Sequence, residues 1–166
     1  MRGQDFPEID FSRLILPPVE LKIVRRNGVY KVFDFIRKDY FCLTPEEFVR
    51  QLFVGWLTKD LGYPPSLMGN EVGIKLNDTI KRCDTIVFSK TGSPLMIVEY
   101  KAPSVNITQE VFNQIVRYNM VLKAEYLVVS NGYNNFCCHV DYATHDIQFL
   151  PNIPSYQEIS GKCQSQ

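Results

Sequence analysis

The chain has 166 residues, 45% of them apolar and 22% charged, which predicts one globular domain with a sizeable core. Eighteen basic residues balance eighteen acidic ones, so the overall basic excess of a dedicated nonspecific DNA binder is missing. No apolar run is long enough to span a membrane, no secretory signal pattern opens the chain, and the five cysteines have no CxxC spacing. We therefore expect a cytoplasmic protein without a membrane segment or a disulfide framework.

The first part of the chain predicts an irregular arm followed by a hairpin. Residues 1–19 mix acids, prolines and scattered apolar residues, which is typical of an irregular arm, either free or packed over the core. Within residues 20–35, Asn27-Gly28 separates two alternating runs, a strong signal of a hairpin turn. From Lys22 to Lys38, six basic residues stand against one acidic residue. This cluster either contacts phosphate groups or forms an ordinary solvated hairpin face.

A long helix is predicted over residues 44–61. Thr44 can cap its N-terminus in front of a proline, and Glu47 completes a capping box. Glu47 has a second interpretation, as an acidic residue that serves a functional site. Arg50 lies one turn further on and can pair with an acid of the first turn. A short strand is expected after the helix, at residues 70–76, from its alternating pattern.

A second hairpin is predicted next, and it carries the acidic residues of interest. Its arms, residues 82–88 and 95–101, are rich in β-branched and large apolar residues and enclose a turn. Folding the arms about the centre of this turn places Asp84 opposite Glu99, where Cβ atoms lie about 4.5–5.5 Å apart. Lys101 is expected on the face of Glu99, so this face would carry two carboxylates and an ammonium group.

Two opposed carboxylates repel, so a positive group is expected between them. Lys101 is one candidate. A hard divalent cation is another, because Mg²⁺ takes one or two carboxylates together with waters and phosphate oxygens. The alternative is an ordinary salt-bridge cluster of Asp84, Glu99 and Lys101 on a solvated sheet face. Arg82 lies two residues before Asp84 and is expected on the same face, where it would neutralise the acids or contact a phosphate.

A second helix is predicted over residues 108–122, followed by a buried strand. Gln114 and Tyr118 are one turn apart on one side of this helix, so both can reach one ligand. Taken without other information, the pattern favours a surface amide for Gln114 and a half-buried core aromatic for Tyr118. Residues 125–130 form a nearly continuous apolar run, which favours a strand buried on both faces and parallel to the strand before the helix.

The last elements complete the predicted domain. Two more strands are expected at residues 135–140 and 146–150, where alternating or apolar runs are bounded by turn residues. Prolines then close the domain, which we place at residues 20–155, after the arm. Residues 156–166 are polar for the most part and are interpreted as a flexible C-terminal tail.

The acidic hairpin and the helix that follows it carry an ordered series of residues that resembles the signature of a nuclease superfamily. Asp84 followed by Glu99-Tyr100-Lys101 is similar to the D…(D/E)xK pattern of the restriction-endonuclease-like, or PD-(D/E)XK, nucleases, with Cys83 where the name has proline. Residues 114–118 match the QxxxY motif of one branch of that superfamily. The sequence from residue 37 to residue 151 resembles the N-terminal nuclease domain of type I restriction enzyme R subunits. The resemblance implies an α/β fold with a mixed β-sheet flanked by helices.

The same resemblance implies a DNA endonuclease that hydrolyses phosphodiester bonds with Mg²⁺ or Mn²⁺. Asp84 and Glu99 would hold the metal, and the backbone carbonyl of Tyr100 would add a ligand. Lys101 would position or deprotonate the attacking water and stabilise charge on the phosphate. Glu47 would order the water shell of the metal.

Further residues and partners follow from the resemblance. Gln114 and Tyr118 would orient the substrate or the active-site strand, and Arg50 and Arg82 are the candidate substrate-binding residues. The R subunits couple such a domain to a DNA-translocating motor, which 166 residues cannot also contain. The expected partners are therefore DNA and a separate motor or specificity protein, with a homodimer as a further alternative.

A second function class remains open. The same fold could be a catalytically silent module that binds nucleic acid or a protein partner. The intact Asp84, Glu99 and Lys101 favour the nuclease, because an inactive site gives no reason to keep a repulsive acidic pair. The balanced net charge favours the silent module.

Overall fold

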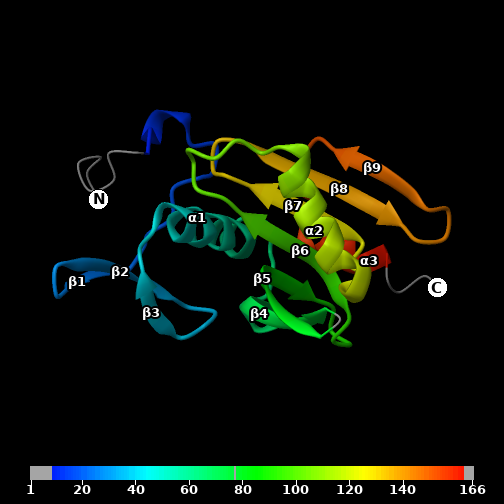
Figure 1. The fold of residues 1–166 in the computed structure, drawn as a ribbon, viewed down its shortest axis with the longest axis horizontal. Helices are drawn as coiled ribbons and strands as arrows, with labels where there is room; N and C mark the ends of the chain where they lie inside the picture. The colour runs from blue at the N-terminus through cyan, green and yellow to red at the C-terminus, as the bar shows by residue number, and fades with distance from the viewer. Residues whose placement is uncertain (1–8, 77, 163–166) are drawn as a thin grey trace.

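The computed structural model describes residues 9–76 and 78–162 and folds most of them around a six-stranded sheet of order β4-β5-β6-β7-β8-β9 (Figure 1). Its strands are β4 (Met68–Leu76), β5 (Thr79–Phe88), β6 (Pro94–Tyr100), β7 (Tyr126–Ser130), β8 (Asn135–Asp141) and β9 (Asp146–Leu150). Strands β6 and β7 pair in parallel and the other neighbours pair antiparallel. The predicted α/β fold with a mixed sheet is therefore confirmed.

Helix α1 (Pro45–Lys59) covers one face of this sheet and begins where the sequence predicts (Figure 1). The Thr44 hydroxyl accepts a hydrogen bond from the Glu47 N–H at 3.1 Å, which satisfies one of the free donors of the first turn. The capping box is only half formed, because the Thr44 N–H donates to the carbonyl of Cys42 at the end of the preceding strand and the Glu47 carboxylate has other partners. Phe53 packs edge-on against Tyr100, with ring centroids 5.6 Å apart.

Helix α2 (Gln109–Leu122) covers the opposite face and connects β6 to β7 (Figure 1). Ile115 is fully buried and belongs to a core cluster that includes Ile97 of β6 and Leu127 of β7. Every residue of β7 is buried. The predicted strand, covered on both faces and parallel to its predecessor, is confirmed.

The β5–β6 hairpin has the register that the sequence predicts. Thr85 pairs with Val98, so Asp84 and Glu99 are the next two opposed residues. In the turn, Gly92 has a φ of +87°, a conformation that residues with a Cβ avoid. A register shift lies next to the turn, far enough from the acidic residues to leave their pairing unchanged.

A separate three-stranded sheet precedes α1 and consists of β1 (Ile23–Arg26), β2 (Val29–Asp34) and β3 (Asp39–Cys42). Strands β1 and β2 form the predicted hairpin, with Asn27 and Gly28 at positive φ in its turn. Strand β3 is an addition that no sequence pattern predicted. This small sheet lies beside α1, at the end of the molecule away from β9 (Figure 1).

The N-terminal arm packs on the core in the part that the structure describes. It contains a 3-10 turn, η2 (Phe11–Arg13), and a second such turn, η3 (Pro65–Leu67), leads into β4. Ile9 and Leu16 are buried, and the N–H of Ile15 donates to a carbonyl of the β7–β8 loop at 3.0 Å. The arm is irregular as expected, and of the two alternatives the described part follows the one in which it packs over the core.

The predicted tail needs correction in its first half. Residues Tyr156–Lys162 form a helix, α3, in which Tyr156 and Ile159 are buried. The Tyr156 ring packs against Tyr63 with centroids 5.6 Å apart. The packed part of the domain thus extends beyond residue 155, because α3 buries an apolar side on the core. None of the helices in the described ranges is long and apolar enough to cross a membrane.

Candidate active site

Three acidic residues occupy one row across strands β4, β5 and β6. The pairs Asn70–Thr85 and Thr85–Val98 place Glu71, Asp84 and Glu99 at neighbouring positions of the three strands. Glu71 has a φ of +56°, the left-handed region that costs a side-chain-bearing residue about 1–2 kcal/mol. Such backbone strain is concentrated at functional sites. The sheet therefore maintains this row at the cost of a strained backbone at Glu71.

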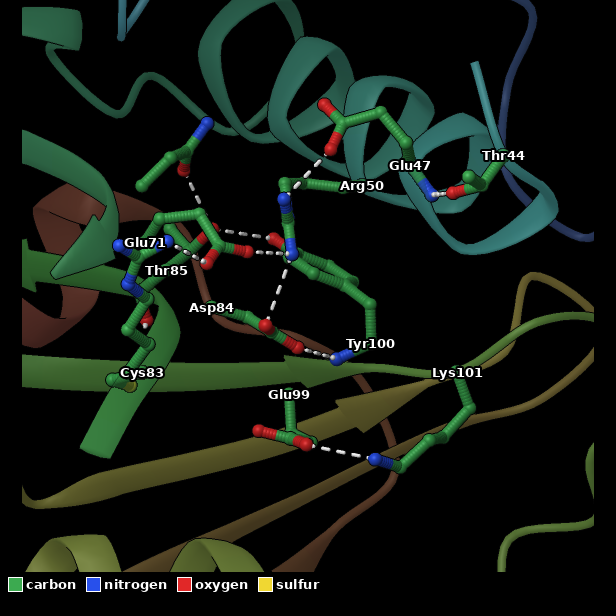
Figure 2. A network of polar contacts seen from close by, with 12 residues as sticks. Thr44, Glu47, Arg50, Glu71, Cys83, Asp84, Thr85, Glu99, Tyr100 and Lys101 are labelled. Atoms are coloured by element: carbon green, nitrogen blue, oxygen red, sulfur yellow. Dashed lines mark hydrogen bonds and ion pairs between the residues drawn. The ribbon is translucent and has the colours of Figure 1, made fainter. Parts of the chain in front are cut away.

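Arg50 of α1 reaches down to this row and holds three carboxylates (Figure 2). Its Nη2 atom lies 2.9 Å from Asp84 Oδ1 and 2.6 Å from Glu71 Oε1, and its Nη1 atom lies 2.7 Å from Glu47 Oε2. The side chain is only 4% exposed, and its Nε atom is buried without a hydrogen-bond partner among the described residues. Burial acts to lower the pKa of Arg50, but the carboxylates outweigh it and the pKa is raised. Arg50 is therefore charged, and it is part of the site.

Among the side chains that the structure describes, Asp84 and Glu99 pair with different cationic groups. Asp84 is bound by Arg50 and, at 2.8 Å, by the backbone N–H of Tyr100, whereas Glu99 pairs with Lys101 (Figure 2). The two carboxylates still interact. Burial and then the charge of Asp84 raise the pKa of Glu99 to about 7, and burial raises the pKa of Asp84 as well.

Lys101 and Gln114 fix the Glu99 carboxylate from two elements. Lys101 Nζ lies 2.8 Å from Glu99 Oε1, and the Gln114 amide nitrogen donates to the same oxygen at 2.6 Å. The Lys101 ammonium also donates to Gln114 Oε1 at 3.3 Å. Burial acts to lower the pKa of Lys101, but the bond to Glu99 and its charge raise it, so the ammonium form is favoured. The structure thus brings Gln114 of α2 to the predicted site, while the side chain of Tyr118 lies outside the described residues.

Glu47 lies behind Arg50 and does not contact Asp84 or Glu99. Its carboxylate accepts from Arg50, from Gln51 at 2.8 Å and from Arg37 of the β2–β3 loop. The residue is 7% exposed. Glu47 is therefore bound on several sides by protein donors, and its direct role is to hold Arg50 over the acidic row.

Several residues at the site carry no signal that sequence reasoning used. A buried chain of hydrogen bonds runs from the Tyr100 hydroxyl through Thr85 and Asn70 to Asp34, which in turn binds Arg37. Asp34 lies at the end of β2 and is completely buried. This chain ties the small sheet to the site. Its members are far apart in the sequence, and only their burial in the fold reveals them.

The outer rim of the site adds two more charged residues. Glu46 of α1 is half buried, and burial and then the charge of Asp84 raise its pKa. Arg82 is 74% exposed and lies 3.9 Å from Glu71, so it is placed at the edge of the acidic row rather than over Asp84. Across residues 9–76 and 78–162, no three His, Cys, Asp or Glu side chains are grouped so that they could hold a metal ion.

Comparisons with known proteins give the family. Residues 45–154 match the family described as the type I restriction enzyme R protein N terminus (HSDR_N). The chain belongs to this family. A comparison with curated proteins finds no match.

Among solved structures, this R-protein N-terminal domain is similar to a fragment assigned to the HsdR subunit of a type I restriction enzyme from Vibrio vulnificus YJ016. The two share 18% identity with a TM-score of 0.52, over 72% of this chain and 25% of that chain. At this identity the likeness shows the fold alone. The acidic row, Arg50, Lys101 and Gln114 all lie inside the family match, whereas Asp34, Arg37 and the small sheet precede it.

Proposed function

We propose that this R-protein N-terminal domain is a metal-dependent DNA endonuclease that hydrolyses phosphodiester bonds. The observation that carries the proposal is the opposed pair Asp84 and Glu99, with Lys101 bound to Glu99. Burial raises the pKa of both carboxylates, and the charge of Asp84 raises the pKa of Glu99 further, so the two acids repel each other in a partly desolvated place. A cation bound between the two carboxylates would offset their repulsion.

The charge inventory of the site supports the same proposal. Six carboxyl groups surround four cationic groups, and these are Asp34, Glu46, Glu47, Glu71, Asp84 and Glu99 with Arg37, Arg50, Arg82 and Lys101. A phosphodiester brought to this surface would be repelled by the excess of negative charge. A divalent cation would offset that repulsion.

The donor chemistry of the pair fits Mg²⁺ or Mn²⁺. Carboxylate oxygens of Asp84 and Glu99 are hard ligands, and the backbone carbonyl of Tyr100, the residue between Glu99 and Lys101, is a third oxygen of the type these ions accept. Mg²⁺ commonly takes no more than two carboxylates from a protein, with waters and phosphate oxygens completing its shell. When bound, the metal would polarise the phosphodiester and lower the pKa of a bound water.

The protein's own groups have separate tasks in this proposal. Lys101 is held as an ammonium by Glu99, so it would place positive charge against the phosphate and orient the water. Gln114 would keep both Glu99 and Lys101 in position through its hydrogen bonds to them. Arg50 would keep Asp84 ionised beside the metal. Glu47, proposed earlier to order metal-bound water, would act on the site through Arg50.

A silent nuclease-fold module is the second candidate, and one observation favours it. Both oxygens of Asp84 already have donors, Arg50 and the Tyr100 N–H, so the acid is partly satisfied without a metal. In that case the same residues would form a salt-bridge cluster under a binding surface.

The proposed substrate is DNA, and the proposed setting is the cytoplasm. The chain spans about a quarter of the HsdR fragment it resembles. A motor or specificity protein is the proposed partner in its action on DNA. The predicted homodimer stays a prediction, since the structure contains one chain.

Nicking of supercoiled plasmid by the purified chain tests this function. We expect cleavage that requires Mn²⁺ or Mg²⁺ and that is lost in Lys101→Met, while the exposed Lys90→Met retains it. Equal cleavage by Lys101→Met and the unchanged protein would indicate a contaminating nuclease. Absence of cleavage with DNA, metal and candidate motor proteins together would favour the silent module.

A further inference from the structure

The outer face of the small sheet gathers basic and aromatic side chains. Val32 and Asp34 of β2 point inward and are fully buried, so Lys31 and Phe33, which alternate with them, lie on the outer face. Phe33 pairs with Tyr40 of β3, and their rings meet edge-on with centroids 5.2 Å apart. Two rings are thus presented next to each other on this face, and Phe33 also borders a hollow lined by residues of α1.

Cations from β1 and its approach lie over these rings. Lys22 Nζ is 5.3 Å from the Phe33 centroid and 5.8 Å from the Tyr40 centroid, and Arg26 Cζ is 5.2 Å from the Tyr40 centroid. Lys22 and Arg26 are exposed, and Lys31 is half buried. We call this set the basic–aromatic face, and it consists of Lys22, Arg26, Lys31, Phe33 and Tyr40.

The positive charge of this region is local. Between Lys22 and Cys42 the chain has six basic and two acidic residues, although the whole chain has no net charge. One of the two acids, Asp34, is buried and paired with Arg37, so it does not offset the exposed cations. Lys59 of α1 lines a hollow of about 310 Å³ together with Lys22 and Phe33, although Glu20 lines it as well. The rest of the chain carries the compensating negative charge.

The small sheet is fixed against the candidate active site. Asp34, at the end of β2, accepts a hydrogen bond from Asn70 of β4 at 2.8 Å. Arg37, in the next loop, binds Glu47, which in turn holds Arg50 over Asp84. A ligand bound on the outer face would therefore have a set position relative to the acidic row.

We propose that the basic–aromatic face binds a single strand of DNA. Neighbouring cations that follow a phosphate backbone, combined with aromatic rings on which unpaired bases stack, are the recurring chemistry of such sites. The inference rests on the proposed function in one respect, because it takes DNA as the substrate. The inference goes beyond the proposed function because it places the binding site for the DNA strand on the small sheet, which lies outside the family match. The acidic row itself offers no such binding site.

The proposal is tested by measuring, with fluorescence anisotropy in the presence of EDTA, the affinity of the protein for a labelled single-stranded oligonucleotide. The variant Lys22→Gln/Arg26→Gln/Lys31→Gln is compared with Lys75→Gln/Lys90→Gln/Lys123→Gln, which removes three exposed lysines elsewhere and changes the net charge equally. We expect the first triple variant to lose about tenfold or more in affinity at low salt. Its plot of log affinity against log salt should be shallower by about 2, because each lost phosphate contact on a single strand removes about 0.7. The second triple variant should bind as the unchanged protein does.

The aromatic rings are tested by Tyr40→Leu and Phe33→Leu. Each substitution should lower the affinity for single-stranded DNA by about fivefold or more. The affinity for a duplex of the same length should be unchanged, since duplex bases cannot stack on the rings. Equal losses for the two triple variants would overturn the proposal. The proposal would also be overturned if duplex and single-stranded DNA bound equally well and the aromatic substitutions affected neither. Binding of anionic phosphatidylserine vesicles in place of DNA would overturn it as well.

Two controls keep the test independent of folding and of the nuclease. Lys22→Arg/Arg26→Lys/Lys31→Arg retains the charges and should retain binding, and single glutamine variants serve if the triple variant does not fold. Because the assay is done in EDTA, Asp84→Asn should bind the strand as the unchanged protein does. If the protein binds the DNA strand but no metal at Asp84, only the proposed nuclease function is contradicted. If it binds metal but not the strand, only the proposed role of the basic–aromatic face is contradicted.

Discussion

Arg50 and Asp84 form an ion pair of 2.9 Å in which the arginine side chain is only 4% exposed. The same guanidinium joins Glu71 of β4 and Glu47 of its own helix. One cation therefore connects α1 to two strands of the main sheet. Because Asp84 depends on this cation for its charge balance, Arg50 is at once a structural residue and a part of the candidate active site.

Removal of Arg50 should destabilise the fold strongly. Arg50→Met leaves three carboxylates without their shared partner in a buried place, and we expect the free energy of unfolding to fall by about 3–5 kcal/mol. Urea denaturation measures this. Arg82→Met removes an arginine that is 74% exposed, and it should change the free energy by less than about 0.5 kcal/mol. Similar effects of the two changes would show that Arg50 is not the residue that balances the acidic row.

Gln114 should act as a positioning residue for Glu99 and Lys101. Gln114→Leu removes its hydrogen bonds to Glu99 and Lys101, so Glu99 loses a donor and its carboxylate is less well oriented. We expect Mn²⁺ affinity to fall by about tenfold, as is usual when a partner of a metal ligand is lost. Calorimetry measures the affinity. Gln109→Leu changes an exposed glutamine at the start of the same helix and should leave it unchanged, and equal affinities for all three proteins would exclude the positioning role.

The raised pKa of Glu99 predicts a pH dependence of stability and of metal binding. Its pKa of about 7 in the folded protein lies above the ordinary value of 4.5. The native state therefore holds more protons than the unfolded chain between these values, and the free energy of unfolding falls as the pH rises through this window. A divalent cation requires the ionised form, so Mn²⁺ should raise the Tm more at about pH 8 than at about pH 5.5.

Glu99→Gln provides the control for this pH effect. The amide does not titrate, so the change in Tm between the two pH values should shrink, and Mn²⁺ should have little effect at either. An Mn²⁺-induced rise in Tm that is the same at both pH values in the unchanged protein would contradict the assignment of Glu99 as a ligand.

Helix α3 should contribute to the stability of the domain. Ile159 has no exposed surface, and Ile159→Ala should lower the free energy of unfolding by about 2–5 kcal/mol. Gln157→Ala alters an exposed residue of the same helix and should have little effect. If both changes were neutral in urea denaturation, the original interpretation of residues 156–162 as a tail would hold in solution.

Sequence patterns predicted the elements whose geometry is set locally. The register of the β5–β6 hairpin follows from the turn around Gly92 and from the alternation of its arms, so the opposition of Asp84 and Glu99 could be inferred in advance. The unbroken apolar run of β7 likewise predicted its burial on both faces. In these cases one stretch of chain contains all the information.

The polar connections between elements could not be predicted in this way. Arg50 was expected to pair within α1, yet it also binds Glu71 and Asp84, and Asp34 contacts Asn70 across 36 positions of the chain. Such pairs depend on how the small sheet, α1 and the main sheet pack, which no local pattern encodes. Short elements failed for a related reason, because α3 has few apolar residues and gains its stability from burial on the core.

The central claim is that Asp84 and Glu99 form a metal site, and calorimetric titration of Mn²⁺ tests it most directly. The unchanged protein is compared with Asp84→Asn and with Asp146→Asn, which alters an exposed aspartate of β9. We predict weak binding that DNA strengthens, its loss in Asp84→Asn and its retention in Asp146→Asn. If the unchanged protein binds no metal even with DNA, or if Asp84→Asn binds it equally well, the acidic row is a salt-bridge cluster and the proposed hydrolysis is wrong.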